Sequence, residues 1–209
     1  MPAAATAHND EETARLFIAV VPPAEVRAAL AQAREAFVAA GAPGLRWVAP
    51  EGIHLTLKFL GETALARREE IEAAMAETGA VRPPHSVHLS SYGLFGGRRP
   101  RVLWAGLDGE VDELSACAAQ LDQALGARGF ELEKRSLSPH LTLARAPSGA
   151  GQREGAALRG ALERVPAPPA LELPVTALQL IRSRLRPEGA VYETLTISDL
   201  QGRRAKLVE

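Results

Sequence analysis

The chain has 209 residues, a hydrophobic content of 46% and a formal net charge of -1 at pH 7. These values suit a soluble globular protein and exclude the broad basic field of a general nucleic-acid binder. The single cysteine, Cys117, excludes an intramolecular disulfide and a cysteine-based metal site, and its Ala-rich helical surroundings predict a buried, unreactive thiol. No signal peptide begins the chain and no apolar run reaches the roughly 20 residues of a membrane span, so we expect a cytoplasmic protein.

The first half of the chain alternates short apolar, β-branched runs with segments of helical periodicity. In chain order the pattern predicts strand, helix, two strands, helix and two strands, over residues 15–21, 24–40, 45–48, 53–60, 64–78, 85–95 and 101–107. Turn residues separate these segments, most clearly at 50–52 and 96–100.

The second half repeats this alternation, with helix, strand, helix and two strand regions over residues 111–125, 140–144, 152–165, 173–185 and 191–197. Strands outnumber helices and come in pairs between them, which favours an α+β fold with mainly antiparallel sheets. We expect a single domain over residues 14–200, with a disordered tail at 1–13 and a C-terminal tail at 201–209.

A repeated tetrapeptide is the most informative feature of the sequence. His-Leu-Thr-Leu occurs at 54–57 and again at 140–143, each time within a predicted strand. Side chains alternate between the faces of a strand, so His and Thr share one face and the two leucines share the other. Each copy would therefore anchor itself in the core by leucine and display an imidazole beside a hydroxyl.

One His-x-Thr on a strand is usually part of a solvated surface, but the chain has only five histidines and two stand in identical motifs. Two equivalent lobes related by a pseudo-two-fold axis would bring the motifs together across a cleft. One neutral and one protonated imidazole can serve as base and acid at the same pH, and hydroxyls complement phosphoryl oxygens. Metal binding is the rival interpretation, although threonine hydroxyls are poor ligands and neither motif contains a carboxylate.

Five segments together resemble the two-histidine phosphoesterase superfamily, and within it the RNA 2′,3′-cyclic phosphodiesterases, also called 2′-5′ RNA ligases. They are RLFIAV, IHLTLKFLGE, RPRVLWAGL, SPHLTLAR and LIRSRLRPEGAVYETL, at 15–20, 53–62, 99–107, 138–145 and 180–195. The resemblance implies a bilobal, pseudo-symmetric fold in which two mainly antiparallel sheets flank a central cleft and helices lie outside.

The implied reaction is hydrolysis of 2′,3′-cyclic phosphates on RNA ends or nucleotides to 2′-phosphomonoesters, without metal or other cofactor. Carried onto this chain, the resemblance makes His54 the general acid that protonates the leaving 3′ oxygen and His140 the base that activates water. Thr56 and Thr142 would hydrogen-bond the phosphate oxygens. A monomer that binds RNA ends and no membrane is expected.

Two cations near the motifs are further candidates for substrate binding. Lys58 shares the parity of His54 and Thr56, so simple alternation places it on the cleft face. Arg145 has the opposite parity to His140 and reaches the cleft only if its strand twists or bulges. The resemblance supports a phosphate-binding role for Arg145.

Aromatic residues and a basic loop complete the set of candidates. Phe17 either belongs to the core or stacks on a base of the substrate. Trp104 and Tyr192 either pack in the core or line the cleft. Arg101, in the basic cluster Arg98, Arg99 and Arg101, is a candidate for contact with the RNA backbone.

Two other functions use the same cleft. A non-catalytic module that binds RNA ends or nucleotides would need the phosphate donors but not two titrating imidazoles, so the two histidines weigh against it. The reverse reaction, which joins RNA ends through a 2′-5′ linkage, uses the same groups and is not separable by sequence.

Overall fold

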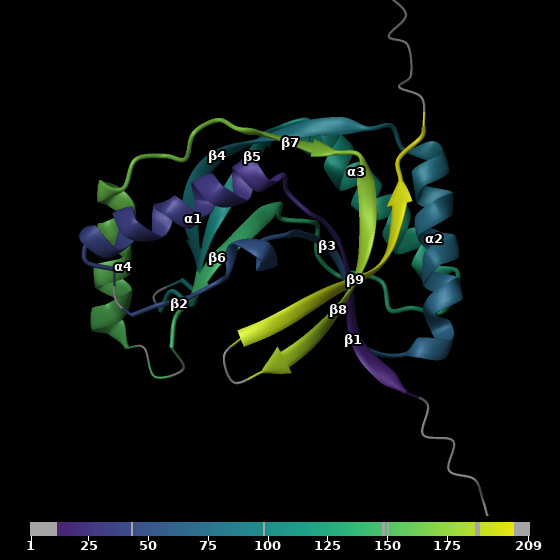
Figure 1. Ribbon diagram of the computed structural model, residues 1–209, viewed down its shortest axis with the longest axis horizontal. Helices are drawn as coiled ribbons and strands as arrows, with labels where there is room; N and C mark the ends of the chain where they lie inside the picture. The colour runs from purple at the N-terminus through teal and green to yellow at the C-terminus, as the bar shows by residue number, and fades with distance from the viewer. Residues whose placement is uncertain are drawn as a thin grey trace, which may run out of the picture.

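The computed structural model describes residues 12–42, 44–97, 99–147, 149, 151–186 and 189–202 (Figure 1). Its strands are β1 (Thr13–Val20), β2 (Arg46–Trp47), β3 (Leu55–Ala64), β4 (His85–Phe95), β5 (Val102–Gly109), β6 (His140–Arg145), β7 (Glu172–Val175), β8 (Ala177–Arg186) and β9 (Gly189–Asp199). Its helices are α1 (Ala24–Ala39), α2 (Arg68–Val81), α3 (Val111–Gly126) and α4 (Gln152–Arg164), with 3₁₀ turns η1 (Pro50–Gly52) and η2 (Leu65–Arg67). Most of the two predicted tails, 1–11 and 203–209, lies outside the described residues.

The strands form one antiparallel sheet in the order β7-β4-β5-β6-β3-β1-β8-β9, with β2 beside β6. The predicted α+β class with antiparallel pairing is thereby confirmed. The structure differs from the expectation of two sheets in one respect. The two sheets are joined into one where Leu55 of β3 pairs with Leu141 of β6. We call the strands on the β6 side of this junction the β6 half-sheet and those on the β3 side the β3 half-sheet.

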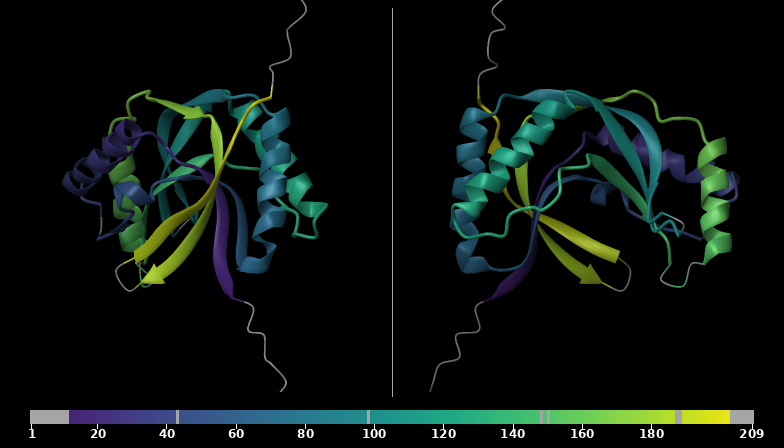
Figure 2. Two further views of the ribbon diagram at one scale, coloured as in Figure 1. Left: turned by 45° about the vertical axis from the view of Figure 1, so that its right-hand side comes forward. Right: turned by 180° about the vertical axis from the view of Figure 1, so that it is seen from behind.

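The sheet curls strongly, and the chain itself requires the curl. Only Thr176 separates β7 from β8, although β7 is one edge of the sheet and β8 lies next to the other edge. So short a connection can join only strand ends that are adjacent in space. The backbone N–H of Leu200, after β9, also donates to the carbonyl of Thr176 at 2.8 Å. The result is the open half-barrel of Figures 1 and 2.

The helices cover the outside of the half-barrel and complete the main core. Helix α2 packs against α3, β8 and β9, and α4 against β4. The apolar positions predicted for the first helix are the ones that α1 buries, namely Val26, Leu30, Ala33 and Phe37. Cys117 of α3 is buried, as predicted, and burial raises the pKa of its thiol to about 11. None of the helices in the described part of the chain is both long and apolar enough to cross a membrane.

The other face of the sheet carries a small, separate apolar cluster. Successive side chains of β1 alternate, so that Leu16 and Ile18 join the main core beneath the helices, whereas Phe17 and Ala19 join Ile181 of β8. We call the face that bears this second cluster the inner face. Figure 2 shows the helices outside the curl, so the inner face is the one that remains for polar side chains and ligands.

We expect Leu141→Ala to lower the free energy of unfolding by about 2–5 kcal/mol, because the change empties a fully buried position where the half-sheets join. Leu141 is 0% exposed, whereas Leu185, at 71%, offers a matched control with the same atoms removed. Leu185→Ala should change stability by less than about 0.5 kcal/mol. Urea unfolding followed by circular dichroism measures both variants. Equal losses would contradict a structural role for the junction.

Candidate active site

The two His-Leu-Thr-Leu motifs meet where the half-sheets join. The first leucine of each motif pairs with its counterpart across β3 and β6. Continuing this antiparallel register by one residue in each direction aligns His54 with Thr142 and Thr56 with His140. Because the paired leucines point into the core, both imidazoles and both hydroxyls gather on the inner face.

Each imidazole is oriented by the backbone carbonyl two residues before it. His54 Nδ1 lies 2.8 Å from the oxygen of Gly52, and His140 Nδ1 lies 2.7 Å from the oxygen of Ser138. A carbonyl oxygen only accepts, so Nδ1 carries the hydrogen in both rings. In the neutral rings Nε2 therefore holds the lone pair, and the two histidines present the same atom for chemistry.

His54 is half-buried beside two aromatic rings of the β3 half-sheet. Its ring centroid lies 4.6 Å from that of Phe17 and 5.1 Å from that of Tyr192. Burial lowers the pKa of His54, the hydrogen bond to Gly52 opposes that effect, and the charges of Arg145 and His140 lower the pKa further. The neutral imidazole is therefore favoured at this position in the free protein.

His140 is half-buried beside two aromatic rings of the β6 half-sheet. Phe95 meets it edge-on at 4.8 Å between centroids, and Trp104 lies 6.4 Å away. The indole of Trp104 needs glycine on two neighbouring positions, since a Cβ on Gly93 would lie 2.2 Å from Cζ2 and one on Gly106 would lie 3.0 Å from Cζ3. Of the two alternatives left open by the sequence, Trp104 therefore lines the inner face.

The hydroxyl groups of Thr56 and Thr142 are available to a ligand. Both residues are half-buried, and neither hydroxyl has a hydrogen-bond partner within the described part of the chain. Among the described residues, no three or more His, Cys, Asp or Glu side chains gather where they could hold a metal ion. The polar groups that converge here are imidazoles and hydroxyls, a set that suits phosphoryl oxygens better than a cation.

Arg145 reaches the inner face because β6 bulges before it. Leu143 and Ala144 are consecutive yet both buried in the main core, and the register between β5 and β6 shifts at this point. The break in alternation turns Arg145 to the side of the histidines. Burial lowers the pKa of His54 and raises that of Tyr192, and the charge of Arg145 reinforces the first effect and opposes the second.

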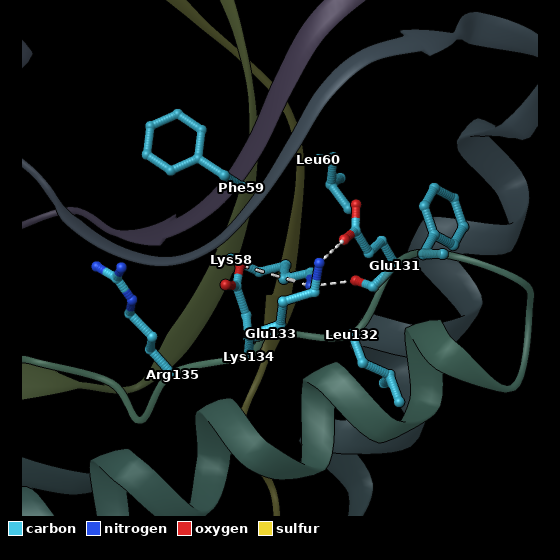
Figure 3. Close-up of a pocket in the computed structure, with 9 residues that line it drawn as sticks. Lys58, Phe59, Leu60, Glu131, Leu132, Glu133, Lys134 and Arg135 are labelled. Atoms are coloured by element: carbon cyan, nitrogen blue, oxygen red, sulfur yellow. Dashed lines mark hydrogen bonds and ion pairs between the residues drawn. The ribbon is translucent and has the colours of Figure 1, made fainter.

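The prediction that Lys58 lies on the cleft face is wrong, because a second bulge reverses the alternation in β3. The register between β1 and β3 skips Leu57, which is buried next to the buried Lys58. Lys58 Nζ lies 2.7 Å from Asp122 Oδ1, 2.5 Å from the carbonyl oxygen of Glu131 and 3.5 Å from Glu133 Oε1. The ammonium group is thus neutralised on the side of α3, and Figure 3 shows it beside Glu131 and Glu133.

A cavity of about 290 Å³ lies beside this ion pair, between residues 58–60 and 130–135. In Figure 3, Phe59 and Arg135 border it on the side opposite Leu132. The bulge that buries Lys58 brings Phe59 to the inner face, where its ring lies 5.7 Å from that of Phe17 and its side chain is 52% exposed. Simple alternation could not find this residue.

Phe17 takes the first of its two predicted alternatives, a place in an apolar cluster, and the predicted contact of Arg101 with RNA stays untested. Phe17 is 1% exposed and packs against His54, so its ring backs the imidazole and has no free face for a base to stack on. Arg101 is exposed immediately before β5, and its Nη1 donates to the carbonyl oxygen of Pro147 at 3.5 Å. Its contact with RNA stays a prediction, and Arg98 of the same basic cluster lies outside the described residues.

Arg46 of β2 is a residue that the sequence analysis missed. It pairs with Arg145 while its neighbour Trp47 pairs with Ala144, and the Trp47 ring lies 6.3 Å from Phe37 in the core. Alternation then directs Arg46 to the inner face. The available signal was the apolar Trp47, which marks the core side of this short strand.

Comparison with known proteins also divides the chain into two matching parts, each with one motif. The sequence profile described as LigT like Phosphoesterase matches the chain twice, over residues 20–104 and 106–192, so that each match contains one His-Leu-Thr-Leu motif. The chain belongs to the LigT-like phosphoesterase family. The resemblance predicted from five short segments is thereby confirmed.

Relatives in this family match most of the chain. The RNA 2′,3′-cyclic phosphodiesterase of Aeropyrum pernix is 32% identical over 167 residues, which are 79% of this chain and 92% of that protein. The RNA 2′,3′-cyclic phosphodiesterase of Thermus thermophilus is 32% identical over 199 residues, 92% and 93% of the two chains. The crystal structure of E. coli LigT complexed with 3′-AMP superposes with a TM-score of 0.73 at 26% identity and covers 90% of this chain and 99% of that one.

We expect Lys58→Met to lower the free energy of unfolding by about 3–5 kcal/mol, because it leaves Asp122 without its buried partner. Lys134→Met is the matched control, since Lys134 is 84% exposed and pairs with the exposed Glu131. Its cost should stay below about 1 kcal/mol. Chemical denaturation measures both. A variant of Lys58 that kept its stability but lost activity would instead place this residue in the site.

We expect His54 in the free protein to titrate below its ordinary pKa of 6.5, since burial disfavours the imidazolium. Arg145→Gln should raise this pKa, because it removes a positive charge that disfavours protonation. Arg34→Gln, on the exposed side of α1, should leave it where it is. Nuclear magnetic resonance titration of the ring protons measures all three, and an unchanged pKa in Arg145→Gln would contradict the inward orientation of Arg145.

Proposed function

We propose that this protein hydrolyses 2′,3′-cyclic phosphates on RNA ends or nucleotides to 2′-phosphomonoesters, by acid–base catalysis from His54 and His140 and without a metal ion. One observation carries the proposal: the motifs meet at the Leu55–Leu141 pair, so that two imidazoles with the same Nδ1 hydrogen bond share the inner face with two threonines, close enough for the charge of His140 to act on His54. The names of the relatives from Aeropyrum pernix and Thermus thermophilus support the substrate class.

The reaction needs one proton removed and one supplied. Nε2 of His140 takes a proton from water as the water oxygen forms a bond to phosphorus. The bond between phosphorus and the 3′ oxygen breaks, and Nε2 of His54 gives its proton to that oxygen. The product carries a 2′-phosphate and a 3′-hydroxyl. This division of roles follows the family resemblance, since the two motifs are identical in sequence.

The acid role of His54 requires the substrate to help protonate it. Burial lowers the pKa of His54 in the free protein. A phosphodiester bears one negative charge, and an anion next to an imidazole favours the imidazolium. Binding of the substrate would therefore raise the pKa of His54 and charge the acid only when the reacting bond is in place.

The non-bridging oxygens of the phosphate would be bound by Thr56, Thr142 and Arg145. Their hydroxyl and guanidinium donors lie on the same face as the two imidazoles, and they complement the charge that develops on a phosphoryl group in the transition state. We propose hydrolysis as the main direction because water is in large excess. Ligation would require a second RNA end held in place of the attacking water.

We expect His54→Ala and His140→Ala each to reduce turnover of adenosine 2′,3′-cyclic phosphate by about 10²–10⁴-fold, the usual contribution of one acid or base. EDTA should leave the wild-type rate unchanged. Chromatography of the products, with 2′-AMP and 3′-AMP as standards, should show 2′-AMP only, since the 3′ oxygen is the one expelled.

His88→Ala is the matched control, because His88 lies in β4 with no role in the proposed reaction. Full activity in either motif variant would overturn the mechanism, and a 3′-phosphate product would reverse the assignment of the leaving oxygen. A wild-type protein that binds the cyclic nucleotide without converting it would favour the non-catalytic binding module.

A further inference from the structure

Two arginines occupy neighbouring positions on the inner face. Arg46 of β2 and Arg145 of β6 occupy directly paired positions, and both side chains are exposed. Within the described residues neither arginine forms an ion pair with a carboxylate. Lys58, by contrast, lies within ion-pair distance of two.

A cross-strand pair of like charges is unfavourable in the free protein. Side chains directly opposite each other on antiparallel strands are close neighbours, and equal charges there destabilise the sheet. An anion between the two guanidinium groups removes this repulsion and accepts hydrogen bonds from both. Guanidinium groups suit phosphate oxygens in particular, because their planar donors bind two oxygens at once. The pair therefore has the properties of a phosphate site.

The position of Arg46 separates it from the reacting phosphate. Thr142, beside His54 in the register, and Arg145, opposite Arg46, are three residues apart along β6. Three residues of a regular strand would span about 10 Å, and the bulge at Leu143 makes this offset shorter. The charge of Arg145 lowers the pKa of His54, and Arg46 is not among the named causes of that shift. Of the two paired guanidinium groups, Arg145 is thus the one whose charge reaches His54, and Arg46 is the one left for a second phosphate.

We propose that Arg46, together with Arg145, binds the phosphodiester that links the terminal nucleotide to the one before it. A mononucleotide 2′,3′-cyclic phosphate has one phosphate, which the histidines and threonines engage. An RNA end has a second, one nucleotide upstream. The subsite would make RNA ends better substrates than free cyclic nucleotides. This inference rests on the proposed function, since it names the substrate class of the same site.

The test compares adenosine 2′,3′-cyclic phosphate with the dinucleotide ApA ending in a 2′,3′-cyclic phosphate. In the wild type, kcat/KM should be at least about tenfold higher for the dinucleotide, as expected for one charge-assisted contact. Arg46→Gln should remove most of this preference, and Arg34→Gln should keep it. The slope of log kcat/KM against log salt for the dinucleotide should become shallower by about 0.7 in Arg46→Gln, for one lost phosphate contact.

A second measurement needs no variant. The same dinucleotide with an uncharged methylphosphonate linkage should be turned over by the wild type no better than the mononucleotide. Full preference for this neutral analogue, or an equal loss on both natural substrates in Arg46→Gln, would overturn the subsite. So would a preference that Arg46→Gln leaves intact.

Failure of the proposed function gives a different result. If the wild type converts neither substrate, calorimetric titration with the non-cyclic dinucleotide ApAp still tests the anion site. Weaker binding by Arg46→Gln than by Arg34→Gln would support the subsite, and equal binding would overturn it.

Discussion

The pairing of β3 with β6 at Leu55 and Leu141 is the contact on which the rest of the structure depends. It joins the two half-sheets, buries two leucines and, through the antiparallel register, sets the two motifs next to each other. Because side chains alternate along a strand, the burial of the leucines and the display of the imidazoles are two consequences of one pairing. A slip of one residue in either strand would exchange the two faces and remove both the core contact and the candidate site.

Two β-bulges then decide which cations face the histidines. In β3 the bulge at Leu57 turns Lys58 into the interior, where carboxylates neutralise it. In β6 the bulge around Leu143 turns Arg145 out to the inner face, where its charge acts on the pKa of His54. With regular strands, the ammonium group of Lys58 would lie on the inner face and Arg145 would not. The bulges instead bring the guanidinium group of Arg145 to that face, and a guanidinium group can bind two phosphate oxygens at once.

Identical motifs lie in unequal surroundings. His54 is enclosed by Phe17 and Tyr192, and burial lowers its pKa. His140 lies beside Phe95 and Trp104, which are held by a different half of the sheet. The proposed reaction uses one imidazole as base and the other as acid, and such asymmetry favours that division, because equal rings would compete for the same proton. The symmetry of the sequence thus supplies the two groups, and the environment distinguishes them.

The sequence by itself determined the class of fold, the core positions of α1, the buried cysteine and the two motifs, because each of these follows from local periodicity or from repetition. It also determined the family, since five short segments in one order are specific in combination. Only the tertiary structure decided that Lys58 is buried, that Arg145 faces the histidines and that Phe17 backs His54. Bulges arise from pairing between distant strands, and parity counted along one strand cannot reveal them. The position of Arg46 opposite Arg145 follows from the same long-range register.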